Sequence, residues 1–336
     1  FSESFKKLFI LWFPWIGCTL VLIFIHGTKN LTQYINAFLI ISLLFTSLFT
    51  FKLNRKTIIN FLSFGLIVLN TIIVFQVIQN GLSGDILETN KNRLIGVITF
   101  ITIAVLSTVI VQRREFTTFE LLVAISAVIL SLVTTILTEV RHAILAYGSC
   151  FVIFLLFGQK KYRNISFYFL VLFVALIALS FITGRMQTGL EDLKEFQKGN
   201  VNTSWGLRIE MWKMALRAFP QAPLFGWGDD ASNAMKAAGI LFPVKTWNIA
   251  HFHSDFFIAL ATGGLTMVVG WVTTVLCLIR NAFKDIPRLC LIASILSTGL
   301  AEQDWFEQNI LFPFVILWTL FYLTDPTKLN RFSGDN

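Results

Sequence analysis

The chain has 336 residues, of which 55% are hydrophobic and only 14% are charged, and its mean hydropathy is +0.72. This composition excludes an ordinary soluble domain, since the apolar residues fall in runs of about 20, the length that crosses a bilayer. The net charge of +8 does not indicate nucleic-acid binding, because the basic residues lie mostly in short connections between apolar runs. We therefore predict an all-α polytopic membrane protein.

Ten apolar segments are predicted to span the membrane as helices. They cover residues 8–26, 31–51, 57–78, 94–111, 117–138, 142–158, 164–183, 254–279, 287–301 and 305–324. Several tryptophans near span ends or within spans are candidate interfacial anchors, namely Trp12, Trp15, Trp271, Trp305 and Trp318. The chain begins at Phe1 and not at Met, and we expect a short N-terminal piece, which could include a helix, to precede it.

The charges between the spans predict the orientation of the chain. Every second junction is short and basic, as the positive-inside rule predicts for cytoplasmic loops, so both ends are placed in the cytoplasm. The remaining junctions face the other side, and all four histidines lie there. Three parts follow: residues 1–183 with seven spans, the loop 184–253 that carries the candidate active site, and residues 254–336 with three spans and a cytoplasmic tail.

The loop of about 70 residues is too long to be a plain connector and should be structured. Residues 190–198 have helical spacing and mixed charge, which favours a solvated surface helix. A second helix is predicted over about 206–219, with an N-cap among residues 202–204 and an end at Pro220. Residues 224–230 then form a glycine-bracketed turn, for which a tight turn with a buried Trp is favoured over a phosphate loop.

Candidate functional residues cluster in this loop. Arg208 and Trp212 share one face of the second predicted helix, and His251 and His253 close the loop before the next span. Either histidine could instead be a structural cap, although a functional role is favoured for His253 at the mouth of a membrane helix. A metal site would need a further ligand such as Asp255, and no matching spacing recurs elsewhere, so a metal site is not favoured.

Two further ionisable groups lie at the membrane edge of the same face. Arg141 lies between two apolar runs, so it is either functional or a snorkelling side chain paired with Glu139. Glu302, next to Asp304, could orient His253 or Arg208, or could belong to a polar rim. Because arginine binds phosphate with a planar fork and histidine is the usual general base, these groups suit transfer from a lipid-linked pyrophosphate.

With these residues the chain resembles the bacterial O-antigen ligases, which belong to a wider ligase/polymerase superfamily of membrane glycosyltransferases. The resemblance covers roughly residues 95–325. Four short motifs carry it, and each is weak alone but all occur in the right order: Thr138-Glu-Val-Arg141, Thr203-Ser-Trp-Gly-Leu-Arg208-Ile-Glu-Met-Trp212, His251-Phe-His253-Ser254 followed by Gly263-Gly264, and Gly299-Leu-Ala-Glu302.

The resemblance implies a GT-C-like fold with about 10–12 transmembrane helices and one large, mainly helical periplasmic loop. It further implies a metal-independent enzyme without cofactors in the bacterial inner membrane, with its active site facing the periplasm. Arg141 and Arg208 would engage undecaprenyl pyrophosphate, and His253 would activate the acceptor hydroxyl. Glu302 matches an acidic position of the family, and His251 and Trp212 are expected to support the site.

The sequence is therefore compatible with three candidate functions. The first is a ligase that moves a glycan from undecaprenyl pyrophosphate to the lipid A–core oligosaccharide with inversion. The second is a polymerase or a protein O-oligosaccharyltransferase of the same superfamily, which would differ only in the acceptor. The third is a lipid-linked glycan flippase, which is disfavoured because the spans are nearly free of charge whereas transporters place polar groups at the bilayer midplane.

Overall fold

The computed structural model describes residues 3–27, 54–80, 85–86, 89–138, 140, 142–158, 185–228, 252–302, 305–306 and 308–324, together with isolated positions between them. Its helices are α1 (Glu3–His26), α3 (Arg55–Asn80), α4 (Lys91–Val111), α5 (Thr118–Leu137), α6 (His142–Phe157), α8 (Arg185–Gln197), α9 (Ser204–Ala218), α11 (Asp255–Ala282), α12 (Ile286–Thr298) and α13 (Gln308–Leu323). Two short 3-10 turns, η2 (Arg113–Glu115) and η4 (Phe219–Gln221), and a two-stranded hairpin of β1 (Asp85–Ile86) and β2 (Thr89–Asn90) complete the described elements.

The chain is an all-α polytopic membrane protein. Five of the described helices, namely α1, α3, α4, α5 and α11, are long and apolar enough to cross a bilayer, and shorter apolar helices lie in α6, α12 and α13. Eight of the ten predicted spans are thus helices within the described part of the chain. The two others, 31–51 and 164–183, fall almost entirely outside the described residues.

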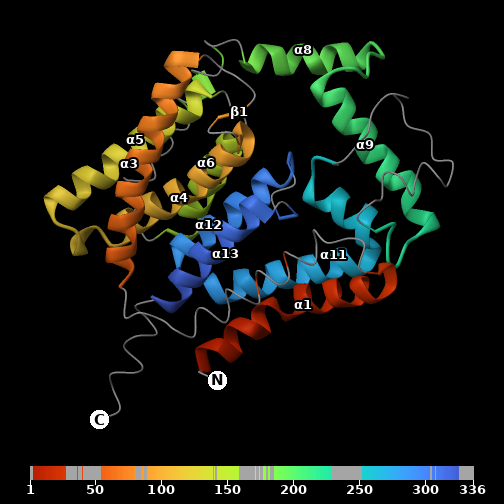
Figure 1. Cartoon of the computed structure of the whole chain (residues 1–336), viewed down its shortest axis with the longest axis horizontal. Helices are drawn as coiled ribbons and strands as arrows, with labels where there is room; N and C mark the ends of the chain where they lie inside the picture. The colour runs from red at the N-terminus through yellow and green to blue at the C-terminus, as the bar shows by residue number, and fades with distance from the viewer. Residues whose placement is uncertain are drawn as a thin grey trace.

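The apolar helices form one packed bundle, and the loop helices lie beyond one end of it. Figure 1 shows α1 running alongside α11, α3 beside α5, and α8 and α9 at the end of the molecule opposite the start of α1. Helices α4 and α12 lie between these groups, and α12 packs against α6. Some buried polar side chains are hydrogen-bonded between helices, as where Asn70 of α3 donates to Ser131 of α5 at 2.9 Å.

The tryptophans of the spans form part of the core. Trp12 and Trp15 of α1, with Trp305 and Trp318, are completely buried, and their rings meet at centroid distances of about 6 Å. The expectation of interfacial anchors was therefore wrong for these four residues. Their large apolar surfaces instead hold α1 against the turn before α13 and against α13 itself.

Helix α11 is broken near its first third, and a turn of the loop completes the hydrogen bonds that the break exposes. Gly264 has φ 58° and ψ −150°, a conformation that only glycine adopts readily. The freed carbonyls of Ala261 and Thr262 accept from the amides of residues 227 and 228, both at 2.8 Å. In return, the amides of residues 265 and 266 donate to the carbonyls of residues 223 and 224.

This close approach explains the first glycine of the turn, Gly226. A Cβ atom at Gly226 would lie 2.5 Å from the backbone of residues 262 and 263, so a side chain cannot be accommodated there. The chain turns here as predicted, with turn residues 223–225 and a bend at Trp227, but Trp227 is half-buried and not buried as expected. The loop is consequently joined to a bundle helix through the main chain of both segments.

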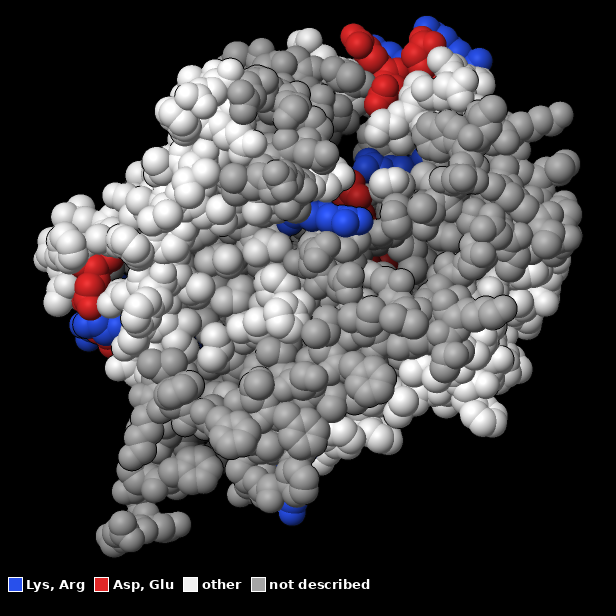
Figure 2. Space-filling view, viewed as in Figure 1, with Lys and Arg blue, Asp and Glu red and all other residues white. Residues whose placement is uncertain are grey.

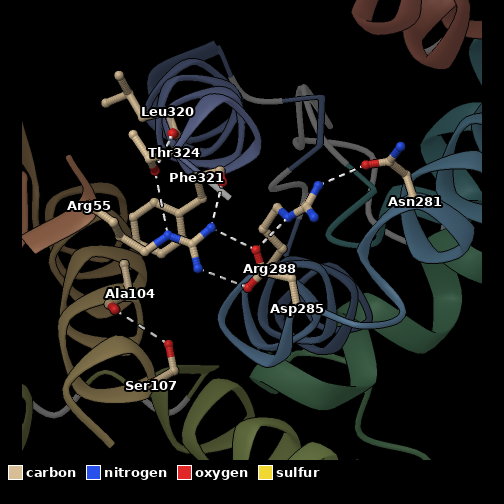
Figure 3. Close-up of polar contacts among 9 residues, drawn as sticks. All are labelled: Arg55, Ala104, Ser107, Asn281, Asp285, Arg288, Leu320, Phe321 and Thr324. Atoms are coloured by element: carbon tan, nitrogen blue, oxygen red, sulfur yellow. Dashed lines mark hydrogen bonds and ion pairs between the residues drawn. The ribbon is translucent and has the colours of Figure 1, made fainter. Parts of the chain in front are cut away.

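A buried ion cluster joins three helices at the end of the bundle away from the loop helices (Figure 3). The positive-inside rule assigns this end to the cytoplasm. Arg55 of α3 donates to both carboxylate oxygens of Asp285, at 3.1 and 2.6 Å, and also to the carbonyl of Phe321 in α13. Arg288 of α12 donates to the same carboxylate at 2.8 Å. Burial by itself would raise the pKa of Asp285, but the charges of Arg55 and Arg288 outweigh it and hold this pKa below its ordinary value.

Removal of the shared carboxylate should destabilise the bundle strongly. In Asp285→Ala, two arginines that are at most 4% exposed lose their common partner, and breaking a buried pair costs about 3–5 kcal/mol. We expect a clearly lower midpoint of thermal unfolding in detergent. The matched control is Glu195→Ala, which breaks an exposed pair with Lys198 and should leave the midpoint unchanged. Equal midpoints for the two variants would contradict a structural role for the cluster.

Candidate active site

Helix α9 presents Arg208. The helix begins at Ser204, two residues before the predicted start, and its cap lies among the residues predicted: the Thr203 side chain accepts a hydrogen bond from the amide of Gly206 at 3.0 Å. Its last residue, Ala218, is followed by the 3-10 turn that contains Pro220. Arg208 lies one turn inside the helix, and its guanidinium is 5.9 Å from the ring centre of Trp205, a favourable cation–π distance.

The second member of the site, Glu302, follows α12. The chain turns tightly after the helix, with the amides of residues 301 and 302 both donating to the carbonyl of Thr298. Gly299 in this turn also accepts a hydrogen bond from the amide of Asp255, at 2.8 Å. The turn is therefore fixed to the start of α11, where His253 lies.

His253 has an unusual backbone conformation. Its φ of 49° lies in the left-handed region, which costs free energy for a residue with a side chain and makes it the one such non-glycine residue in the described part of the chain. This conformation occurs two residues before α11 starts, and it orients the imidazole toward Glu302. The His253 side chain remains 38% exposed, so it is accessible from outside the protein.

Glu302 contacts both candidate cations at once. Its Oε1 accepts from Nη2 of Arg208 at 2.7 Å, and its Oε2 lies 3.1 Å from Nδ1 of His253. Burial alone would raise the pKa of Glu302, but the His253 hydrogen bond and the Arg208 charge outweigh that effect and lower the pKa below its ordinary value. The group is therefore ionised at neutral pH, and its stabilising contacts are lost only as the pH falls below the unfolded value of about 4.3.

Trp212 holds α9 against the segment that carries His253. Its Nε1 donates to the carbonyl of Phe252 at 2.9 Å, and its ring stacks on Phe257 with a centroid distance of 5.2 Å and an interplanar angle of 13°. Since Trp212 follows Arg208 by four residues, both side chains leave the same face of α9. The supporting role expected for Trp212 has a clear geometric basis.

The structure brings some of the expected residues together and leaves others unplaced. Arg208, Glu302, His253 and Trp212 form one cluster, whereas Arg141 and His251 lie outside the described residues, as does Glu139. The Asp255 carboxylate accepts from the amide of Trp305 at 3.0 and 3.1 Å, which is a structural use of this side chain.

Sequence reasoning missed His142, the first residue of α6. It is buried and lies close enough to Glu302 and Arg208 for their charges to interact with its own. Its Nε2 has no hydrogen-bond partner in the described part of the chain. Its position directly after Arg141 was the signal that could have identified it.

Charged side chains are sparse on the face of the molecule shown in Figure 2. Acidic and basic residues gather over α8 and in a hollow beneath it, whereas most of the described surface on that face is neither acidic nor basic. One charged group on this face thus lies where the loop helices meet the bundle, and another lies at the left edge of the view. The first group suits a site for a charged reactant at the edge of a membrane.

Comparison with known proteins adds the family. Residues 126–272 match the family model described as O-Antigen ligase, and this stretch includes Arg208 and His253. Over this segment the chain is similar to the O-antigen ligase family, which supports that family for the protein. The expected resemblance is thereby confirmed, and the family comprises glycosyltransferase-like enzymes of O-antigen pathways, which act on lipid-linked glycans and lipids.

A curated relative covers more of the chain. An uncharacterized protein of Haemophilus influenzae is 25% identical over 308 residues, which represents 86% of this chain and 75% of the relative. The similarity extends well beyond the O-antigen ligase domain on either side. The relative's own activity is uncharacterized, so the chemistry of this chain rests on its site residues.

Loss of the Trp212 contacts should loosen α9 from the bundle. Trp212→Ala removes a hydrogen bond and a stacked pair worth roughly 1–2 kcal/mol together, so trypsin cleavage after Lys213 and Arg217 should be on the order of 10-fold faster. Trp212→Phe keeps the stacked ring and should give an intermediate rate. Leu216→Ala, at a position on the same helix that is 52% exposed, is the control. Equal cleavage rates in all three variants would argue against a role for the Trp212 contacts in holding α9.

Proposed function

We propose that this protein is an O-antigen ligase that transfers a glycan from undecaprenyl pyrophosphate to the lipid A–core oligosaccharide. The observation that carries the proposal is the single carboxylate of Glu302, which contacts an arginine and a histidine at the end of a membrane bundle. Within this proposal, the loop side of the bundle faces the periplasm and the membrane is the bacterial inner membrane.

Arg208 is suited to hold the donor diphosphate. Its guanidinium uses Nη2 for Glu302, and its remaining N–H groups are chemically matched to phosphate oxygens. When the bond between the anomeric carbon and the diphosphate breaks, negative charge develops on the leaving oxygen, and a fixed guanidinium stabilises it. Arg141 is proposed as the second arginine for the same group, on the strength of the family motif in which it lies.

His253 is suited to be the general base. With Nδ1 held by Glu302, Nε2 is the nitrogen available to a hydroxyl of the acceptor sugar. The base removes the hydroxyl proton while the oxygen attacks the anomeric carbon from the face opposite the diphosphate, so the configuration inverts. Glu302 then stabilises the imidazolium that forms, as a carboxylate does behind other catalytic histidines.

The second candidate is a polymerase or a protein O-oligosaccharyltransferase. It would use the same donor site and the same base, and only the acceptor would differ. The single long loop favours the ligase, because two such loops are expected in many polymerases. A flippase is disfavoured, since the Arg208, Glu302 and His253 cluster lies at one end of the bundle and not at its middle.

The central test is complementation of cells that lack the chromosomal copy. Wild-type protein should restore glycan-capped lipopolysaccharide on a gel, whereas His253→Ala at equal expression should leave bare core while lipid-linked glycan accumulates. Loss of a general base typically lowers the rate 10²–10⁴-fold, roughly enough to abolish capping in a growing culture. Full capping by His253→Ala would overturn the assigned base, and unaltered capping with changed glycan length in the wild type would favour a polymerase.

A more conservative change tests the donor site. Arg208→Lys keeps the positive charge but loses the planar fork, so donor turnover by purified protein should fall about 10²-fold. The control is Lys213→Ala on the same helix, whose exposed side chain contacts Glu210 and the ring of Phe196, and it should retain wild-type turnover. If Arg208→Lys turned over donor as fast as that control, bidentate recognition of the diphosphate by Arg208 would be excluded.

A further inference from the structure

The turn that fills the break in α11 has a depth in the bilayer that can be estimated from the lengths of α1 and α11. His26, the last residue of α1, has its Nε2 2.8 Å from the carbonyl of Phe225 in the turn. The apolar span of α1 begins at Lys6, and its 21 residues at about 1.5 Å each extend roughly 30 Å, the thickness of the hydrocarbon core. Phe225 therefore lies where the hydrocarbon meets the headgroups on the loop side.

Helix α11 gives the same depth independently. Its basic end is Arg280, and about 20 residues are needed to cross the hydrocarbon from there, which leads to about residue 260. The break at Gly264 is thus close to the loop-side boundary and slightly within it. Irregular backbone at this depth is tolerated only when protein satisfies its hydrogen bonds, and the turn supplies them to α11.

The outward surface of the turn is apolar. Leu224 is 57% exposed and Phe225 is 38% exposed, and Leu265 beside them in α11 is 44% exposed. Residues 219–228 contain no charged side chain, although they belong to a long polar loop. On α1, whose His26 contacts the turn, Phe24 is 91% exposed within a predicted membrane span.

The residues flanking the turn are typical of a membrane boundary. Trp227 points its polar edge at protein, with Nε1 donating to the carbonyl of Ala218 at 3.2 Å, so that only its apolar ring is left for the boundary region. Arg217, at the end of α9, is exposed and long enough to reach headgroups while Leu216 beside it, 52% exposed, adds to the apolar surface.

We propose that residues 222–228 form a re-entrant turn whose Leu224 and Phe225 side chains insert among the acyl chains of the loop-side leaflet. The partner of this surface is bilayer lipid. The proposal rests on the depth, the apolar surface and the backbone hydrogen bonds, and it does not depend on the reaction catalysed. The re-entrant turn anchors the C-terminal end of α9 to the membrane surface and so fixes the height at which Arg208 meets a membrane-bound substrate.

The test measures the depth of spin labels in protein reconstituted into lipid nanodiscs. Cysteine is introduced singly at Leu224, Phe225 and Leu216, whose exposed side chains should tolerate replacement, and each site is labelled. Unmodified protein serves as the labelling blank, because Cys18, Cys150 and Cys290 are buried and Cys277 is partly buried. Phe24→Cys provides the lipid-exposed reference, and Lys194→Cys on the exposed face of α8 provides the aqueous reference.

Collision rates with oxygen, which concentrates in hydrocarbon, and with a water-soluble nickel chelate give the depth. We expect labels at positions 224 and 225 to favour oxygen over nickel as the Phe24→Cys label does, with position 216 between the two references. Labels at 224 and 225 that respond to nickel like the Lys194→Cys label would overturn the proposal. Because the readout is label depth, it can fail or succeed whether or not the protein ligates glycan.

Discussion

A backbone within a bilayer has no water to hydrogen-bond, and this constraint governs how the loop of this protein is joined to its bundle. A break in a membrane helix exposes two amides and two carbonyls that must find partners. Here the break at Gly264 finds all four in the main chain of one turn of the loop. The loop is thus tied to the bundle by hydrogen bonds that the helix would otherwise make with itself, and α9 has a fixed place.

The candidate site depends on the fixed position of α9 relative to the bundle. Arg208 comes from α9, His253 from the segment before α11, and Glu302 from the turn after α12, so three elements must meet within hydrogen-bonding distance. Trp212 fixes the first to the second, and the Asp255–Gly299 hydrogen bond fixes the second to the third. A carboxylate that is only 16% exposed between two such partners is strongly oriented, which is the condition for preorganised catalysis.

Much of this arrangement could be predicted from the sequence, because its signals are local. Hydropathy located the spans, Thr203 and Pro220 bounded α9, and the spacing of Arg208 and Trp212 placed both on one face. The pairing of Glu302 could only be offered as one of several possibilities, since its partners lie 94 and 49 residues away. The break in α11 was not predicted, because two adjacent glycines in an apolar run are equally compatible with a continuous helix. The burial of Trp12 and Trp305 was missed because anchoring and core tryptophans have the same sequence pattern.

The ion cluster at the other end of the bundle also sets an order of assembly. Arg55 precedes Asp285 by 230 residues, so at roughly 5–20 residues per second its partner is synthesised on the order of 10–50 seconds after it. During that interval the guanidinium at the start of α3 has to stay in the headgroup region, since an unpaired charge is costly in the hydrocarbon. The final seating of α3 against α12 and α13 therefore waits for the last third of the chain, and the newborn protein passes through a stage in which its first helices are inserted but not yet locked.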